Sequence, residues 1–192
     1  MGREAMKWER RVRKHFDFLL DHEFAFGGVD DSSFWETGAT YLGGRVGIEI
    51  ADSRETNRVE IDLIRLDDGR LPEPQIWVTD ERINRTLLDN VIEARRHPSL
   101  SQLPALSARS VDEQLATWAR LLKDVAPEVM RGDDAPIADA EAMVRQRVAE
   151  HPQEVVVWLP HDASDERERL ALTDAERRAP EGVTVHVRRY DR

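Results

Sequence analysis

The sequence predicts an α+β fold with an N-terminal helix, an antiparallel sheet, and further helices packed on that sheet. Three observations support this prediction. Apolar residues recur at helical spacing over residues 3–20, and again after residue 84. Between residues 23 and 65 they alternate instead, in short segments joined by few residues, which is typical of an antiparallel meander of about four to five strands. The end of the chain, from residue 155, has the strand–helix–strand pattern of a βαβ unit.

The N-terminal helix is expected from about Arg3 to Leu20. Its apolar face is expected to contain Met6, Val12, Phe16, Leu19 and Leu20. Two strands should follow, over residues 23–29 and 34–42; Gly27-Gly28 with Asp30-Asp31-Ser32 indicates a turn at the end of the first, and Gly43-Gly44 a tight connection after the second. These glycines allow the tight connections that a meander needs.

Residues 45–72, which read RVGIEIADSRETNRVEIDLIRLDDGRLP, predict two alternating strands joined by a polar turn. One face of this ribbon is apolar and carries Val46, Ile48, Ile50, Val59, Ile61 and Leu63. Glu49, Glu60 and Asp62 fall at the alternate positions and therefore belong to the other face. The ribbon is expected to present an acidic surface on one side.

The second half of the chain predicts mainly helices. A short strand is expected at 75–78 and a helix at 84–96, followed by a loop at 99–109. Ser110 and Glu113 form a capping box, which predicts that a helix begins there and ends before Pro127. A further helix is expected over 133–151. The βαβ unit is expected as a strand at 155–159, a helix at 164–178 and a strand at 183–187.

The loop at 99–109 is the best candidate for an internal boundary. It would separate residues 1–98, which contain the first helix and the sheet, from residues 110–192, which contain the helical segment and the βαβ unit. At 192 residues the chain also fits one continuous domain.

Composition excludes several classes of function. The formal charge of −10 disfavours nucleic-acid binding and attachment to an anionic membrane, and it suits a partner with a basic surface. The chain has no cysteine, which excludes disulfides and thiolate chemistry. No apolar run approaches the ~20 residues of a membrane span, and no signal peptide precedes the first helix. A cytoplasmic location is expected.

The acidic side of the ribbon is the leading candidate site. Its predicted docking carboxylates are Glu49, Asp52, Glu60 and Asp62. Trp35 and Trp77 lie near strand ends and are candidate anchors at its rim. The alternative is an ordinary solvent-exposed face, because Arg45, Arg58 and Arg65 are close in sequence and can neutralise the carboxylates.

Signals for catalysis are weaker. His22, Glu23, Asp30 and Asp31 surround one predicted strand and turn, and they are the best residues for a carboxylate–histidine site. Ser33 with His22 and Asp21 could form a triad on paper, but no nucleophile elbow supports it. The six histidines lack metal-ligand spacing and no phosphate-binding glycine loop is present, so neither a metal nor a cofactor is predicted.

Residues 35–72 resemble small acidic proteins of bacterial toxin systems, including immunity-type and uncharacterised domains. The segments that carry the resemblance are WETGATY, VGIEIADS and VEIDLIRLDDGRLP, with a helix before them and helices after them. The resemblance covers about the first half of the chain and does not include the βαβ unit. It implies a protein that binds and blocks a cognate toxin and needs no active site.

Three functions therefore remain open. The leading hypothesis is a non-enzymatic cytoplasmic binding protein, of immunity or interaction type, that docks a basic partner protein through the acidic face. The second is a small hydrolase-like enzyme with a site near residues 22–31. The third is a structural subunit of a larger assembly, which an exposed apolar patch would indicate. The sequence does not predict an oligomeric state.

Overall fold

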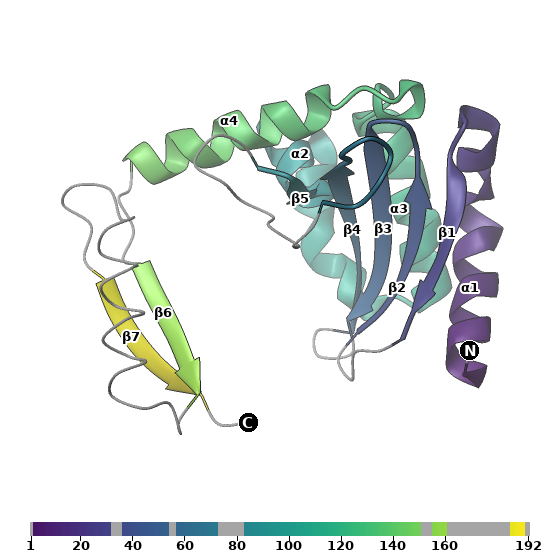
Figure 1. Cartoon of the computed structure of the whole chain (residues 1–192), viewed down its shortest axis with the longest axis horizontal. Helices are drawn as coiled ribbons and strands as arrows, with labels where there is room; N and C mark the ends of the chain where they lie inside the picture. Colours follow the sequence, from purple (N-terminus) through teal and green to yellow (C-terminus); the bar gives the residue numbers. More distant parts are fainter. Residues whose placement is uncertain are drawn as a thin grey trace. The chain divides into compact units, whose positions relative to one another are not determined.

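A computed structural model describes residues 2–31, 36–53, 57–72, 83–150, 155–160 and 185–190, with side chains up to residue 147 (Figure 1). The chain divides into two compact units, Met1–Met143 and Val144–Arg192. The division falls inside a helix near residue 143 and not at the predicted boundary of 99–109. The reason is that the helix after that segment packs on the sheet and shares its core.

The first unit contains a five-stranded antiparallel sheet with the strand order β1-β2-β3-β4-β5. Its strands are β1 (Ala25–Asp30), β2 (Glu36–Leu42), β3 (Val46–Ser53), β4 (Arg58–Arg65) and β5 (Arg85–Leu87). Neighbours in sequence are neighbours in the sheet, so the predicted meander is confirmed. The predicted ribbon forms β3 and β4, the longest strand pair in the sheet.

The helical elements are α1 (Arg3–Phe16), η1 (Asp17–His22), α2 (Leu88–Ala94), η2 (Pro98–Ala108), α3 (Val111–Val125), η3 (Val129–Arg131) and α4 (Ala135–Glu150). The predicted capping box is confirmed, since Ser110 accepts from the Glu113 amide and the Glu113 side chain accepts from the Ser110 amide. The helix α3 ends at Val125, two residues before Pro127, as the proline predicts.

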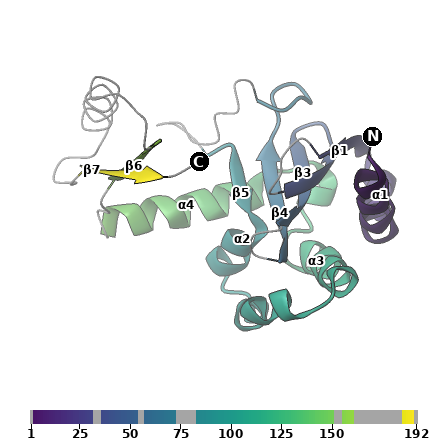
Figure 2. The same ribbon diagram turned by 90° about the horizontal axis from the view of Figure 1, so that it is seen from below.

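The helices α1, α2 and α3 lie on one side of the sheet (Figure 2). Residues from these helices and from one face of the strands form a single core, in which Phe16, Ile48, Ile61 and Trp118 are almost completely buried. Because side chains alternate along a strand, the carboxylates between these apolar positions point to the opposite face. The fold thus separates a helix-covered face of the sheet from a second face that bears acidic residues.

The α3 helix also completes the hydrogen bonding of β4. Strand β5 is short and pairs with β4 only from Asp62 to Ile64, so Val59 lies beyond its reach. Gln114 Oε1 accepts from the Val59 amide at 2.8 Å, and Trp118 Nε1 donates to the Val59 carbonyl at 2.7 Å. Two side chains one helical turn apart therefore replace the missing strand at this edge.

Several sequence predictions need correction. The first helix ends at Phe16 and continues as a 3-10 segment, and Met6 and Leu20 are 49% and 40% exposed instead of buried. Ala5 and Trp8 occupy the inward positions of the first two turns. Residues 85–87, predicted as helix, form β5, because they pair with the edge of β4 before α2 begins.

The predicted loop at 99–109 is largely the 3-10 segment η2, which contributes Leu103 and Leu106 to the core. In the second unit, β6 (Val155–Pro160) and β7 (Val185–Tyr190) pair in parallel, as the βαβ pattern predicts. The predicted strand at 75–78 and the predicted helix at 164–178 lie outside the described residues. In the described part of the chain, no helix combines the length and the apolar character of a membrane span.

Candidate functional site

Five carboxylates from four strands share the face of the sheet that points away from α1, α2 and α3. Glu49 of β3 is paired with Asp62 of β4, and Ala51 is paired with Glu60. Each pair is part of a row of side chains that runs across the strands, and the two rows are adjacent on this face. Asp30 pairs with Gly38, which in turn pairs with Ala51, so Asp30 and Glu60 belong to the same row. Glu36 lies two residues before Gly38 and points to the same side. We call Asp30, Glu36, Glu49, Glu60 and Asp62 the acidic face.

Asp52 does not belong to the acidic face, although the sequence analysis placed it there. It lies two residues after Ile50 and pairs with Val59, and both of these residues are in the core. Strict alternation therefore directs Asp52 to the helix-covered side, where it borders a small hollow beside α1.

An internal arginine occupies part of the acidic face. Arg85 of β5 places Nη2 at 2.6 Å from Asp62 Oδ2 and Nη1 at 3.0 Å from Glu49 Oε2. The side chain of Asp62 is only 8% exposed and that of Glu49 is 19% exposed. Two of the four predicted docking carboxylates are thus committed to a cation of the same molecule, which corrects the predicted arrangement.

The middle of the acidic face consists of small residues that are buried. The row from Asp30 to Glu60 contains Gly38 and Ala51 between them, and both are buried in spite of their small side chains. A Cβ atom added at Gly38 would lie 2.7 Å from Glu49 Oε1, which shows that the Glu49 carboxylate lies over this glycine. The accessible groups of this part of the face are therefore the partly exposed carboxylates Glu36 and Glu60, and not Gly38 and Ala51.

The negative charges of this face are incompletely neutralised. Burial raises the pKa of Glu49; Arg85 opposes this, while Asp62, Glu36 and Asp30 raise it further. Burial likewise raises the pKa of Glu60, against the effect of Arg58 and with additional repulsion from nearby carboxylates. Ionisation of Glu49 and of Glu60 therefore costs free energy that an additional cation would reduce.

Arg58 is mainly engaged elsewhere, since its guanidinium pairs with Asp89 at the start of α2. Among the described residues, Glu36 and Glu60 form no hydrogen bond or ion pair. These two partly buried side chains, and not Glu49 and Asp62, are the members of the acidic face that can accept an external cation. The two predicted aromatic anchors, Trp35 and Trp77, lie outside the described residues.

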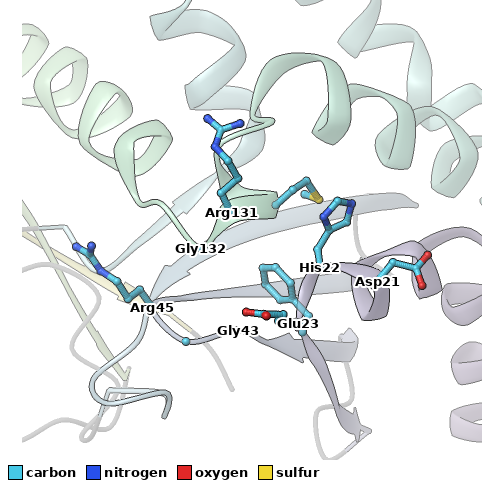
Figure 3. Close-up of a pocket in the computed structure, with 10 residues that line it drawn as sticks. Asp21, His22, Glu23, Gly43, Arg45, Arg131 and Gly132 are labelled. Carbon is cyan, nitrogen blue, oxygen red and sulfur yellow. The ribbon is translucent and has the colours of Figure 1, made fainter.

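A second candidate is an open hollow of about 620 Å³ at the other end of β1. The end of η1, the β2–β3 turn and the end of η3 line it, and it contains His22, Glu23, Arg45 and Arg131 (Figure 3). Asp21 also borders the hollow, but its side chain points away from the other labelled side chains (Figure 3). The sequence does not predict that Arg45 and Arg131 lie beside His22 and Glu23, because turn residues give no periodic signal.

The hollow brings together only two of the four residues predicted for a carboxylate–histidine site. His22 and Glu23 lie before β1, whereas Asp30 and Asp31 lie at its far end, roughly 20 Å along the strand. Asp31 Oδ2 is instead close to Gly2 at the start of α1. The predicted catalytic cluster therefore does not form.

The structure also gives no support for a triad of Ser33, His22 and Asp21. Within the described residues no hydrogen bond joins His22 to Asp21, and Ser33 lies outside them. In the part of the chain that the structure describes, no three His, Asp or Glu side chains converge as a metal site would require.

Comparison of the chain with protein-family models, curated proteins and solved structures finds no match.

Proposed function

We propose that this protein is a non-enzymatic binding protein whose acidic face docks a basic surface of a partner protein. The observation that supports this most is that Glu36 and Glu60 are partly exposed on this face and, among the described residues, form no hydrogen bond or ion pair. These two carboxylates accept the charged end of a cationic side chain of the partner.

Arg85 indicates which chemical group fits this surface. Its guanidinium bridges Glu49 and Asp62, which are directly opposite each other on β3 and β4. Arginine suits such a bridge because its planar fork directs several N–H donors to two carboxylates at once. We expect a partner arginine to bind on the same face at Glu36 of β2 or Glu60 of β4, which lie on either side of β3.

The proposed role is of immunity type in the cytoplasm, in which binding alone neutralises a basic partner. Such a role needs no catalytic group, and negative surface potential would speed encounter with a positively charged protein. The enzymatic alternative loses its geometric support because its four residues occupy opposite ends of β1.

Affinity capture from the native lysate tests the proposal. The informative variant is Glu36→Gln with Glu60→Gln, which removes two negative charges and keeps side-chain size. The matched control is Asp68→Asn with Asp124→Asn, which removes two exposed carboxylates from other parts of the molecule. We expect the first variant to lose partner capture and the control to retain it.

Thermal unfolding of both variants serves as a check on folding. Equal capture by the wild type and the Glu36/Glu60 variant, with both proteins folded, would show that the acidic face is only a solvent-exposed surface. Equal loss in both variants would show that capture depends on net charge and not on this face.

A further inference from the structure

The charge of α1 is opposite to that of the rest of the molecule. Its 14 residues contain six Lys and Arg side chains and two Glu side chains, a formal charge of +4. The whole chain carries −10, so the remainder carries −14. Two of the three lysines of the protein are also on this helix. Such a reversal of sign over one element is the second strong charge feature of the molecule, after the acidic face.

The cations of α1 form a stripe along its outer side. Arg3, Lys7, Arg10 and Lys14 are spaced four, three and four residues apart, which places them on one side of a helix, and all four are exposed. The inward positions are taken by Ala5, Trp8, Val12 and Phe16. The stripe extends over roughly 16 Å at the rise of an α-helix. We call these four cations the basic stripe.

Internal carboxylates leave most of this stripe unneutralised. Lys7 lies 3.9 Å from Glu4 and Lys14 lies 3.8 Å from Asp112, and every one of these side chains is at least 48% exposed. Ion pairs of this length and exposure contribute little free energy and leave the two lysines available to a partner. Within the described residues Arg3 and Arg10 form no ion pair.

An exposed apolar side chain, that of Met6, lies among these cations. A hollow of about 390 Å³ is lined by Arg3, Met6, Lys7, Arg10 and Arg11. Met6 is 49% exposed there, the largest exposed fraction among the big apolar side chains of the described residues. A surface that combines an apolar side chain with surrounding cations fits a peptide in which apolar and acidic residues are interspersed.

We infer that the basic stripe and Met6 form a docking surface for an acidic segment of a partner protein. A nucleic acid fits less well, because the charge of −14 outside α1 repels a long polyanion and Glu4 and Glu9 add negative charge to the same helix. A lipid surface also fits less well, because the apolar side of α1 is buried in the core and leaves only Met6 to insert.

This inference does not rest on the acidic face. The two surfaces have opposite charge, lie on opposite layers of the first unit and share no residue. A partner bound through one surface leaves the other available.

Fluorescence anisotropy tests the inference, with the full-length protein and a labelled oligoglutamate peptide that contains leucine. The informative variant is Arg3→Gln, Lys7→Gln and Arg10→Gln together. The matched control is Arg96→Gln, Arg109→Gln and Arg120→Gln, which removes the same charge from exposed positions elsewhere. We expect the first variant to weaken binding by about tenfold at low salt and the control to leave it nearly unchanged.

Met6 provides a second criterion, independent of charge. Met6→Ser should weaken binding of the leucine-containing peptide several-fold, whereas Met6→Leu should retain it. Equal weakening by the two triple variants, or no effect of Met6→Ser, would overturn the inference in favour of nonspecific attraction.

Three further measurements distinguish an acidic peptide from the other ligands of this surface: a nucleic acid, a lipid membrane and a second copy of this chain. The inference is also overturned if a DNA oligonucleotide of equal charge, or vesicles containing phosphatidylserine, bind more tightly than the peptide with the same dependence on Arg3, Lys7 and Arg10. It is overturned as well if sedimentation shows self-association that the triple variant abolishes, since the occupant would then be a second copy of this chain.

Discussion

At the level of single residues, the Arg85 guanidinium lies within hydrogen-bonding distance of two carboxylates, Asp62 at 2.6 Å and Glu49 at 3.0 Å. Desolvation lowers the pKa of Arg85, but the hydrogen bond and the attraction of Asp62 outweigh this and raise it above its ordinary value. Arg85 thus remains charged and holds together the centre of the acidic face.

Removal of this cation should be strongly destabilising. We expect Arg85→Met to lower the free energy of unfolding by about 2–4 kcal/mol at pH 7, because it leaves two partly buried carboxylates without a partner. Denaturant unfolding measures the change. The additional substitutions Glu49→Gln and Asp62→Asn should recover most of the loss, since they remove the unpaired charges. A control at the exposed Arg45, whose pair with Asp134 is 3.4 Å long, should change stability by less than about 1 kcal/mol.

Glu60→Gln should have the opposite effect, a rise in melting temperature at neutral pH. The folded-state pKa of Glu60 is raised, so its ionised form destabilises the folded protein at any pH above that pKa. As the pH falls through the raised pKa, the wild type gains a proton and loses this penalty. The advantage of the variant should therefore be complete at pH 7 and absent below the ordinary glutamate pKa of about 4.3. Melting curves at both pH values check this, and an equal advantage at the two would contradict it.

At the level of elements, the contact between α3 and β4 determines how the helical layer is attached to the sheet. Gln114 and Trp118 satisfy both backbone groups of Val59, where the short β5 leaves the edge of β4 unpaired. Gln114 also donates to the backbone carbonyls of Asn57 and Arg109, so one buried amide links the β3–β4 turn to the start of α3.

We expect Gln114→Leu to lower the free energy of unfolding by about 1–3 kcal/mol, because the buried Val59 amide loses its acceptor. Hydrogen exchange should show a selective loss of protection at Val59. The neighbouring substitution Ala116→Leu, at an exposed position of the same helix, serves as a control and should leave that amide protected. Unchanged protection in Gln114→Leu would contradict the proposed role of this side chain.

The sequence predicts those elements whose local pattern and tertiary environment agree. Alternation identified β3 and β4, and the capping box identified the start of α3, since both signals depend on neighbouring residues alone. It did not identify β5, because Arg85–Leu87 is a strand only through pairing with β4. For the same reason Arg85 was missed as the partner of Glu49 and Asp62, which alternation correctly placed on one face. Asp52 is not on that face, because it is two residues from Ile50 and alternation places both side chains on the side of the core.

At the level of the whole molecule, the first unit contains a core that is complete without the second. The residues of that core extend from Trp8 to Ala140. We expect a chain truncated after Glu150 to retain a cooperative transition within a few degrees of the full-length melting temperature, because the core residues are all present. Calorimetry of both proteins checks this. Loss of the cooperative transition would show that the second unit is needed for folding of the first.

The two charged surfaces also belong to the whole molecule, and they differ in how far the sequence predicts them. The acidic side of the ribbon follows from the period of a strand, which the sequence displays. The basic stripe was not predicted, because the net charge of −10 conceals a local charge of +4 on α1. The net charge is a sum over the whole chain, whereas a partner contacts one surface at a time.

The most direct test of the central claim is an NMR titration of the isotopically labelled protein with an oligoarginine peptide. The account predicts amide shifts concentrated at Asp30, Glu36, Gly38, Ala51 and Glu60, which disappear in the Glu36→Gln, Glu60→Gln variant and persist in the Asp68→Asn, Asp124→Asn control. Shifts spread evenly over the exposed carboxylates, or shifts at Gly38 and Ala51 that survive the Glu36/Glu60 substitutions, would contradict it.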